Sequence, residues 1–139
     1  MSYNFKRALG ISFLMYIATF VVALVCGLVS GQDMSSMAVI PDYYWYVGMV
    51  GVIILMVLFS FWYFKTTTVM ASAKAGLLFS LTTVVLSIIL DIILFSLGNA
   101  SGAEVDIWMY YGDFRFWIIV ILILLTGTLV GHKKSVPTI

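Results

Sequence analysis

Long apolar segments alternate with short polar segments along the chain. Each apolar segment approaches the ~20 residues that an α-helix needs to cross the hydrocarbon core of a bilayer. The pattern therefore predicts an all-α integral membrane protein, folded over residues 1–139 as one four-helix transmembrane bundle. The expected spans are approximately 8–30, 44–64, 75–98 and 115–131.

The third segment is apolar except for a narrow polar face that includes Asp91. At ~100° per residue, this acid shares its face with small and hydroxyl residues. Small residues let a second helix approach closely, and hydroxyls supply hydrogen bonds. An acid facing lipid costs roughly 2.5–3.5 kcal/mol on insertion scales, so we expect Asp91 to point into the bundle. The other members of the face are Gly76, Ser80, Thr83, Ser87 and Gly98.

The first segment has a similar face, and we expect both faces to lie toward the bundle interior. Its members are Ser12, Tyr16, Thr19, Ala23, Cys26, Gly27 and Ser30. Residues with small side chains also recur at spacings that favour close helix contact. The expected packing residues are Ala23, Gly27, Gly48, Gly51, Gly127 and Gly131, with Gly31 continuing the first series.

Composition supports a membrane protein. The chain is 63% hydrophobic and 9% charged, with a mean hydropathy of +1.15. Soluble domains carry roughly 25% charged residues. The expected partner is thus the lipid bilayer, joined by other membrane-protein subunits or further copies of the chain. Nucleic acid is excluded because no basic patch of the necessary size is present.

The basic residues predict the orientation, because cytoplasmic loops carry an excess of Lys and Arg. Six of them fall on one side of the predicted bundle: Lys6, Arg7, Lys65, Lys74, Lys133 and Lys134. Only Arg115 falls on the other side, together with Asp33, Asp42, Glu104, Asp106 and Asp113. We therefore expect a multi-pass protein of the cell membrane with both termini cytoplasmic.

Aromatic residues gather at the predicted outer rim, where 106–111 is expected to form a short interfacial helix. Aromatic rings commonly anchor a protein at the headgroup level of a bilayer. The alternative is that they line the bottom of a pocket for a lipid or a quinone-like ligand. These residues are Tyr43, Tyr44, Trp45, Tyr46, Trp108, Tyr110 and Tyr111.

Residues with catalytic or metal-binding chemistry are scarce. Cys26 is the single cysteine and His132 the single histidine. One chain therefore cannot form a cysteine metal cluster or a bis-histidine haem site. The nucleotide-binding, metalloprotease and serine-hydrolase motifs are absent. The sequence predicts no enzyme activity, no metal and no cofactor.

Asp91 has two interpretations. As a structural group it would be hydrogen-bonded, or paired with Arg115 at the mouth of the fourth segment. As a functional group it would bind a proton or cation, since intramembrane acids are functional candidates by default. The candidates for ligand or ion coupling are Asp91, Arg115, Ser87 and Thr83.

The expected function is a noncatalytic one, as an accessory or assembly component of the membrane. The main alternative is a small proton- or cation-coupled transporter or channel subunit that uses Asp91. Small multidrug transporters have a similar length and number of spans, but their acid lies in the first helix, where this chain has none. A weaker alternative is a lipid- or quinone-binding protein.

The predicted topology can be tested with single cysteines at Thr67 and Ser101 in a Cys26→Ala background. We expect a cysteine at Thr67 to react with an impermeant thiol reagent only after the membrane is permeabilised. A cysteine at Ser101 should react in intact cells. Labelling of both positions from outside would rule out the four-span arrangement.

Overall fold

A computed structural model describes residues 3–30, 42–66, 69–100 and 107–135 of the chain. These residues form five α-helices and contain no strand. Four of the helices are long and apolar enough to cross a membrane, which confirms the expected number. The helices are α1 (Phe5–Ser30), α2 (Asp42–Tyr63), α3 (Ala73–Ala100), the short α4 (Ile107–Tyr111) and α5 (Phe114–Ser135).

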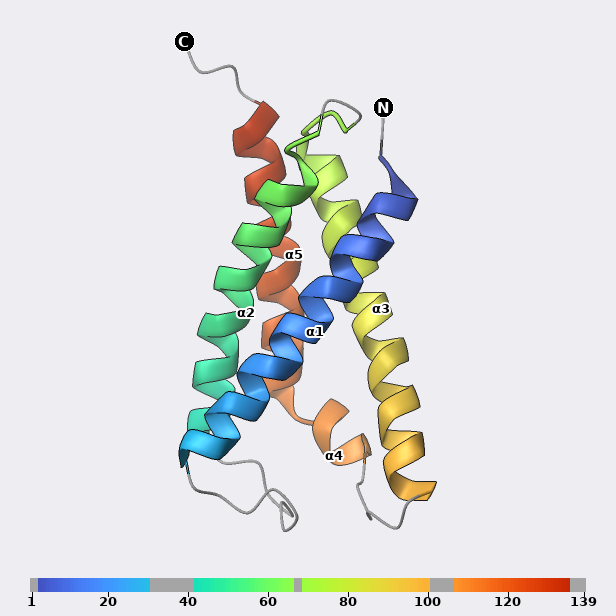
Figure 1. The fold of residues 1–139 in the computed structure, drawn as a ribbon. Helices are drawn as coiled ribbons and strands as arrows, with labels where there is room; N and C mark the ends of the chain where they lie inside the picture. The colour runs from blue at the N-terminus through green and yellow to red at the C-terminus, as the bar shows by residue number, and fades with distance from the viewer. Residues whose placement is uncertain (1–2, 31–41, 67–68, 101–106, 136–139) are drawn as a thin grey trace.

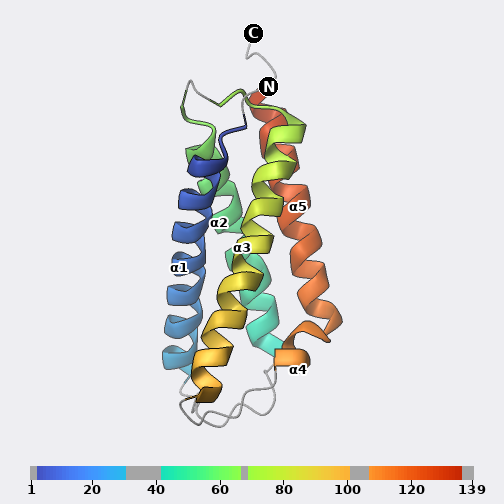
Figure 2. The same ribbon diagram turned by 90° about the vertical axis from the view of Figure 1, so that its right-hand side faces the viewer.

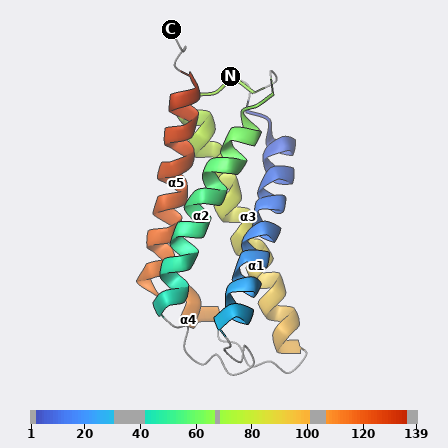
Figure 3. The same ribbon diagram turned by 60° about the vertical axis from the view of Figure 1, so that its left-hand side comes forward.

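The four long helices run alternately up and down (Figure 1). In order around the bundle they are α1, α2, α5 and α3, so that α3 contacts both α1 and α5. We call the end where α1 begins and α5 ends the N/C end. The opposite end, where α4 lies next to the start of α5, is the α4 end (Figures 2 and 3).

All four long helices begin slightly earlier than the hydrophobic pattern predicts, and polar residues cap three of them. Asn4 Oδ1 accepts the backbone N–H of Arg7 at 3.0 Å at the start of α1. Ser72 Oγ accepts the N–H of Ala75 at 3.0 Å before α3. At the start of α5, Asp113 Oδ1 accepts the Arg115 N–H at 2.9 Å. Each cap satisfies a backbone donor that the first helical turn leaves unpaired.

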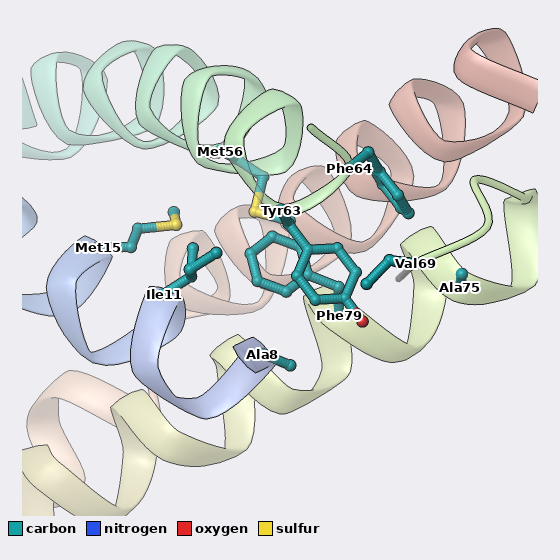
Figure 4. Close-up of a cluster of buried hydrophobic side chains, with 9 residues drawn as sticks. All are labelled: Ala8, Ile11, Met15, Met56, Tyr63, Phe64, Val69, Ala75 and Phe79. Atoms are coloured by element: carbon teal, nitrogen blue, oxygen red, sulfur yellow. The ribbon is translucent and has the colours of Figure 1, made fainter. Parts of the chain in front are cut away.

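The main hydrophobic core lies toward the N/C end (Figure 4). At its centre the fully buried rings of Tyr63 and Phe79 are stacked, with centroids 4.5 Å apart and planes within 6°. This contact joins α2 to α3, and residues from α1 close the core from a third side. The cluster consists of Ala8, Ile11, Met15, Met56, Tyr63, Phe64, Val69, Ala75 and Phe79.

Polar contacts reinforce this end of the bundle. The Arg7 side chain donates to the carbonyl oxygens of Trp62 at 2.7 Å and Tyr63 at 3.2 Å, which are at the end of α2. Those carbonyls lie in the last turn of α2, where the donors of a further turn are missing and partial negative charge collects. The Trp62 carbonyl also accepts the Lys65 backbone N–H at 3.3 Å. Asn4 donates its backbone N–H to the Tyr63 hydroxyl at 3.2 Å. The start of α1 is therefore tied to the end of α2.

Helices α3 and α5 come closest where glycines face each other. A Cβ atom added at Gly76 would lie 2.1 Å from the carbonyl oxygen of Gly127, and one at Gly131 would lie 2.4 Å from the Ser72 carbonyl oxygen. Two of the expected packing residues, Gly127 and Gly131, thus lie at this contact, and Gly76 is their counterpart on α3. Because the atoms in the way belong to the backbone, no side-chain movement would make room for a larger residue.

The remaining expected packing residues differ from one another. A Cβ at Gly51 would meet only Val22, at an ordinary 3.7 Å. Gly48 has no described atom within 4 Å of such a Cβ, so the described residues give it no close helix contact. Ala23 is half-buried in α1. The surroundings of Gly27 and the whole of Gly31 lie outside what the structure describes.

The glycine contact predicts the effect of a single added methyl group. Gly76→Ala should lower stability in a detergent melting assay, because overpacking typically costs ~1–3 kcal/mol. Gly10→Ala is the matched control, since Gly10 is exposed on α1 with no described atom near its Cβ position. That control should melt at or above the wild-type temperature. If both variants melted like the wild type, the close α3–α5 approach would be incorrect.

Candidate functional site

The polar faces of α1 and α3 are in contact with each other. Ser12 and Thr83, both buried, have hydroxyl oxygens 2.7 Å apart. Because the Thr83 hydroxyl donates to the Phe79 carbonyl at 3.0 Å, the proton between the two hydroxyls comes from Ser12. The sequence predicts that both faces lie inside the bundle, and the structure adds that they pair.

Asp91 is at the junction of three helices. The Tyr16 hydroxyl of α1 donates to Asp91 Oδ1 at 2.7 Å. The Tyr111 hydroxyl at the end of α4 donates to Asp91 Oδ2 at 3.3 Å. Both oxygens of the partly buried carboxyl group are therefore hydrogen-bonded. The Tyr16 bond has the ordinary length for a hydroxyl donor, while the Tyr111 bond is long and weaker.

Tyr111 remains a hydrogen-bond donor over the whole ordinary pH range. Burial raises the pKa of its hydroxyl well above the usual range, and the negative charge of Asp91 adds to the rise. Both effects disfavour a phenolate, which would carry a second negative charge in the same place. The Tyr111 hydroxyl therefore stays available as a donor to Asp91 Oδ2.

Aromatic rings hold α4 against the rest of the bundle. Tyr110 stacks on the buried Trp45 of α2, with centroids 5.5 Å apart and planes within 17°. It also contacts Phe116 of α5 at 5.2 Å and Phe95 of α3 at 6.4 Å between centroids. Trp117 Nε1 donates to the Tyr111 carbonyl at 3.0 Å. One short helix thus contacts all three of α2, α3 and α5.

This arrangement divides the predicted aromatic rim into two groups. Trp45, Tyr110 and Tyr111 pack inside the α4 end, where the rings fill space against one another. Tyr43, Tyr46 and Trp108 are exposed. The expected short helix is confirmed over Ile107–Tyr111, while its place at a membrane interface stays a prediction; Asp106 lies outside the described residues.

The hypothesis that Arg115 pairs with Asp91 is wrong. The Arg115 guanidinium binds both carboxylate oxygens of Asp113, with Nη2 2.7 Å from Oδ2 and Nε 3.0 Å from Oδ1, and it also pairs with Asp42. Its carbon atom Cζ lies 5.1 Å from the centroid of Trp45. Arg115 starts near the helix mouth, where two acids are in reach. It therefore need not enter the apolar part of the bundle.

These contacts also account for two of the outer acids. Hydrogen bonds from Arg115 hold the pKa of Asp113 below its usual range. Asp42 and Asp113 are consequently joined through one cation. The described residues contain no group of three or more His, Cys, Asp or Glu side chains that would hold a metal ion. Asp33, Glu104 and Asp106 lie outside the described residues.

The other candidates have different surroundings. Thr83 belongs to the buried contact with Ser12, at the helix interface. Ser87, one turn from Asp91, is half-buried. The sequence interpretation includes Tyr16 and Tyr111 but does not identify them as partners of Asp91. Two sequence features could have identified them: Tyr16 is on the polar face of α1, and Tyr111 is at the end of the expected short helix.

Comparison with known proteins finds no matching family model, no matching curated protein and no matching solved structure.

The Tyr111 contact gives a test of how α4 is held. Tyr111→Phe removes one donor to Asp91 while keeping the ring contacts, so stability in detergent should fall by ~0.5–1.5 kcal/mol. Tyr46→Phe is the matched control, because Tyr46 is 66% exposed on α2. It should melt like the wild type. Equal melting temperatures for both variants would show that the Tyr111–Asp91 bond contributes nothing to the fold.

Proposed function

We propose that this chain is a small, noncatalytic multi-pass protein of the cell membrane that acts as an accessory or assembly component. The single observation that carries the proposal is the state of Asp91, whose two oxygens accept hydrogen bonds from two other helices. A carboxyl group engaged in this way connects helices. A coupling group needs instead a path by which an ion or proton reaches it and leaves.

Three other buried polar side chains in the bundle support the same role. Ser12 and Thr83 bind each other, and Ser80 donates to the carbonyl of Gly76 within its own helix at 2.8 Å. These side chains serve helix contact, as small and hydroxyl residues commonly do in membrane proteins. The outward surfaces of the four long helices are rich in exposed aliphatic and aromatic side chains. Such surfaces suit lipid or the helices of another membrane protein.

The proposed orientation has both termini on the cytoplasmic side. The lysines are found where α1 and α3 begin and where α2 and α5 end, which is one end of the bundle. Arg115, at the opposite end, is paired with two acids and so adds little net charge there. The positive-inside rule then assigns the N/C end to the cytoplasm.

The proposal is tested by purification of the full chain from its native membrane in mild detergent, followed by native mass spectrometry. We expect a complex with another membrane protein in a fixed ratio. In a parallel assay, proteoliposomes of the wild type and of Asp91→Asn should be equally tight to protons and to monovalent cations. Asparagine retains an acceptor for the tyrosine hydroxyls, so this variant removes the titratable carboxyl group with little change in packing.

The alternative transporter function predicts the opposite result in the second assay. A wild-type proton or cation flux that Asp91→Asn abolishes, at an unchanged melting temperature, would establish Asp91 as a coupling group. A copurifying lipid or quinone in a fixed ratio, in place of a protein, would favour the ligand-binding alternative. Either outcome would overturn the accessory role.

A further inference from the structure

The N/C end carries a concentration of lysines that no described acid neutralises. The acids in the described residues lie elsewhere: Asp42 begins α2 at the α4 end, Asp91 is in the far half of α3, and Asp113 precedes α5. The lysines at the N/C end are all exposed, and they are Lys6, Lys65, Lys74, Lys133 and Lys134.

Arg7 does not belong to this exposed set. Its positive charge lies against the C-terminal end of α2 and offsets the partial negative charge there. Its guanidinium is bound to the carbonyl oxygens of Trp62 and Tyr63. The C-terminal end of a helix carries partial negative charge, which repels anions. At α2 this charge is already compensated by Arg7, so Lys65 just beyond the helix remains available for an anion from outside.

Three of the lysines gather where α2 and α5 meet. Lys134 extends from α5 across to α2, with its Nζ 4.8 Å from the centroid of Phe61. Lys65 follows Phe61 by about one helical turn, and Lys133 precedes Lys134 in sequence. The C-terminal ends of α2 and α5 lie side by side (Figures 1 and 3). We call this region the α2–α5 seam, defined by Phe61, Trp62, Lys65, Lys133 and Lys134.

The seam combines positive charge with exposed aromatic rings. Phe61 and Trp62 are 42% and 47% exposed, at the last turn of an apolar helix. Rings at this depth contact the glycerol and upper acyl region of a lipid, while lysine ammonium groups reach the phosphate layer. An anionic lipid headgroup is attracted by about fivefold in affinity for each nearby lysine.

We propose that the α2–α5 seam binds the headgroup of an anionic phospholipid. The ammonium groups of Lys65, Lys133 and Lys134 contact the phosphate, and the rings of Phe61 and Trp62 contact the lipid below it. The occupant is a lipid because charge and apolar surface adjoin at the end of helices suited to a bilayer. This proposal is independent of the accessory role and would hold equally for a transporter.

The test uses the full chain in nanodiscs that contain equal amounts of phosphatidylcholine and phosphatidylglycerol in both leaflets, so that orientation does not matter. Native mass spectrometry then counts the lipids that stay bound to the protein when it is released from the nanodisc. We expect the wild type to retain phosphatidylglycerol in preference to phosphatidylcholine. The variant Lys65→Gln/Lys133→Gln/Lys134→Gln should lose this preference by about tenfold or more. The control variant Lys6→Gln/Lys74→Gln, on α1 and α3, should keep most of it.

Two checks separate lipid binding from folding. Melting in nanodiscs of phosphatidylcholine alone should be the same for the wild type and the triple variant. If the triple variant melts lower, Lys65→Gln/Lys133→Gln decides the matter, because it leaves the Lys134–Phe61 contact intact, and it should still lower phosphatidylglycerol retention severalfold. Equal retention of the two lipids by the wild type would overturn the proposal. Equal losses in the seam variant and the control variant would also overturn it, since diffuse surface charge would then explain the binding.

Discussion

The structure depends on one constraint, which is that polar groups in apolar helices need partners inside the bundle; among the buried side-chain nitrogen and oxygen atoms of the described residues, only Ser60 Oγ and Trp45 Nε1 have none. Asp91 presents the constraint most severely, because a carboxyl group in hydrocarbon is expensive and no basic side chain is bonded to it in the described structure. Two tyrosine hydroxyls meet this need, one from α1 and one from α4. The same carboxyl group thus joins α3 to both α1 and α4.

The two ends of the bundle are built differently. At the N/C end, close glycine contact and the stacked pair of Tyr63 and Phe79 give a dense core, and Arg7 ties two helices together. At the α4 end, α4 is held by rings, by the Asp91 carboxyl group and by Trp117. Regions with fewer buried apolar contacts open at lower free energy. We therefore expect α4 to separate from the bundle before the N/C end does.

Much of the fold could be predicted from the sequence. Runs of apolar residues predicted the four long helices within a few residues, and the polar faces correctly marked Ser12, Thr83, Tyr16 and Asp91 as interior. Helix starts were less accurate, because Asn4, Ser72 and Asp113 extend the helices beyond the apolar runs as caps.

The partner of Asp91 was beyond sequence reasoning for a geometric reason. Ala23 lies as far along α1 from Lys6 as Asp91 lies along α3 from Lys74, so depth counted along parallel helices points to Ala23. In the bundle α1 is inclined to α3 (Figure 1). The Tyr16 hydroxyl, rather than a group at Ala23, reaches Asp91 Oδ1, at 2.7 Å. The sequence hypothesis paired Arg115 with Asp91 and overlooked a nearer acid. Asp113 is only two residues away and binds the Arg115 guanidinium.

The central claim is that Asp91 holds helices together, and a double-mutant cycle between Asp91 and Tyr16 tests it most directly. The free energy of unfolding in detergent is measured for the wild type, Asp91→Ala, Tyr16→Phe and the double variant. A hydrogen bond between these two side chains predicts a coupling free energy of about 0.5–3 kcal/mol. Additive effects, with a coupling free energy near zero, would contradict the account and leave Asp91 free for another role.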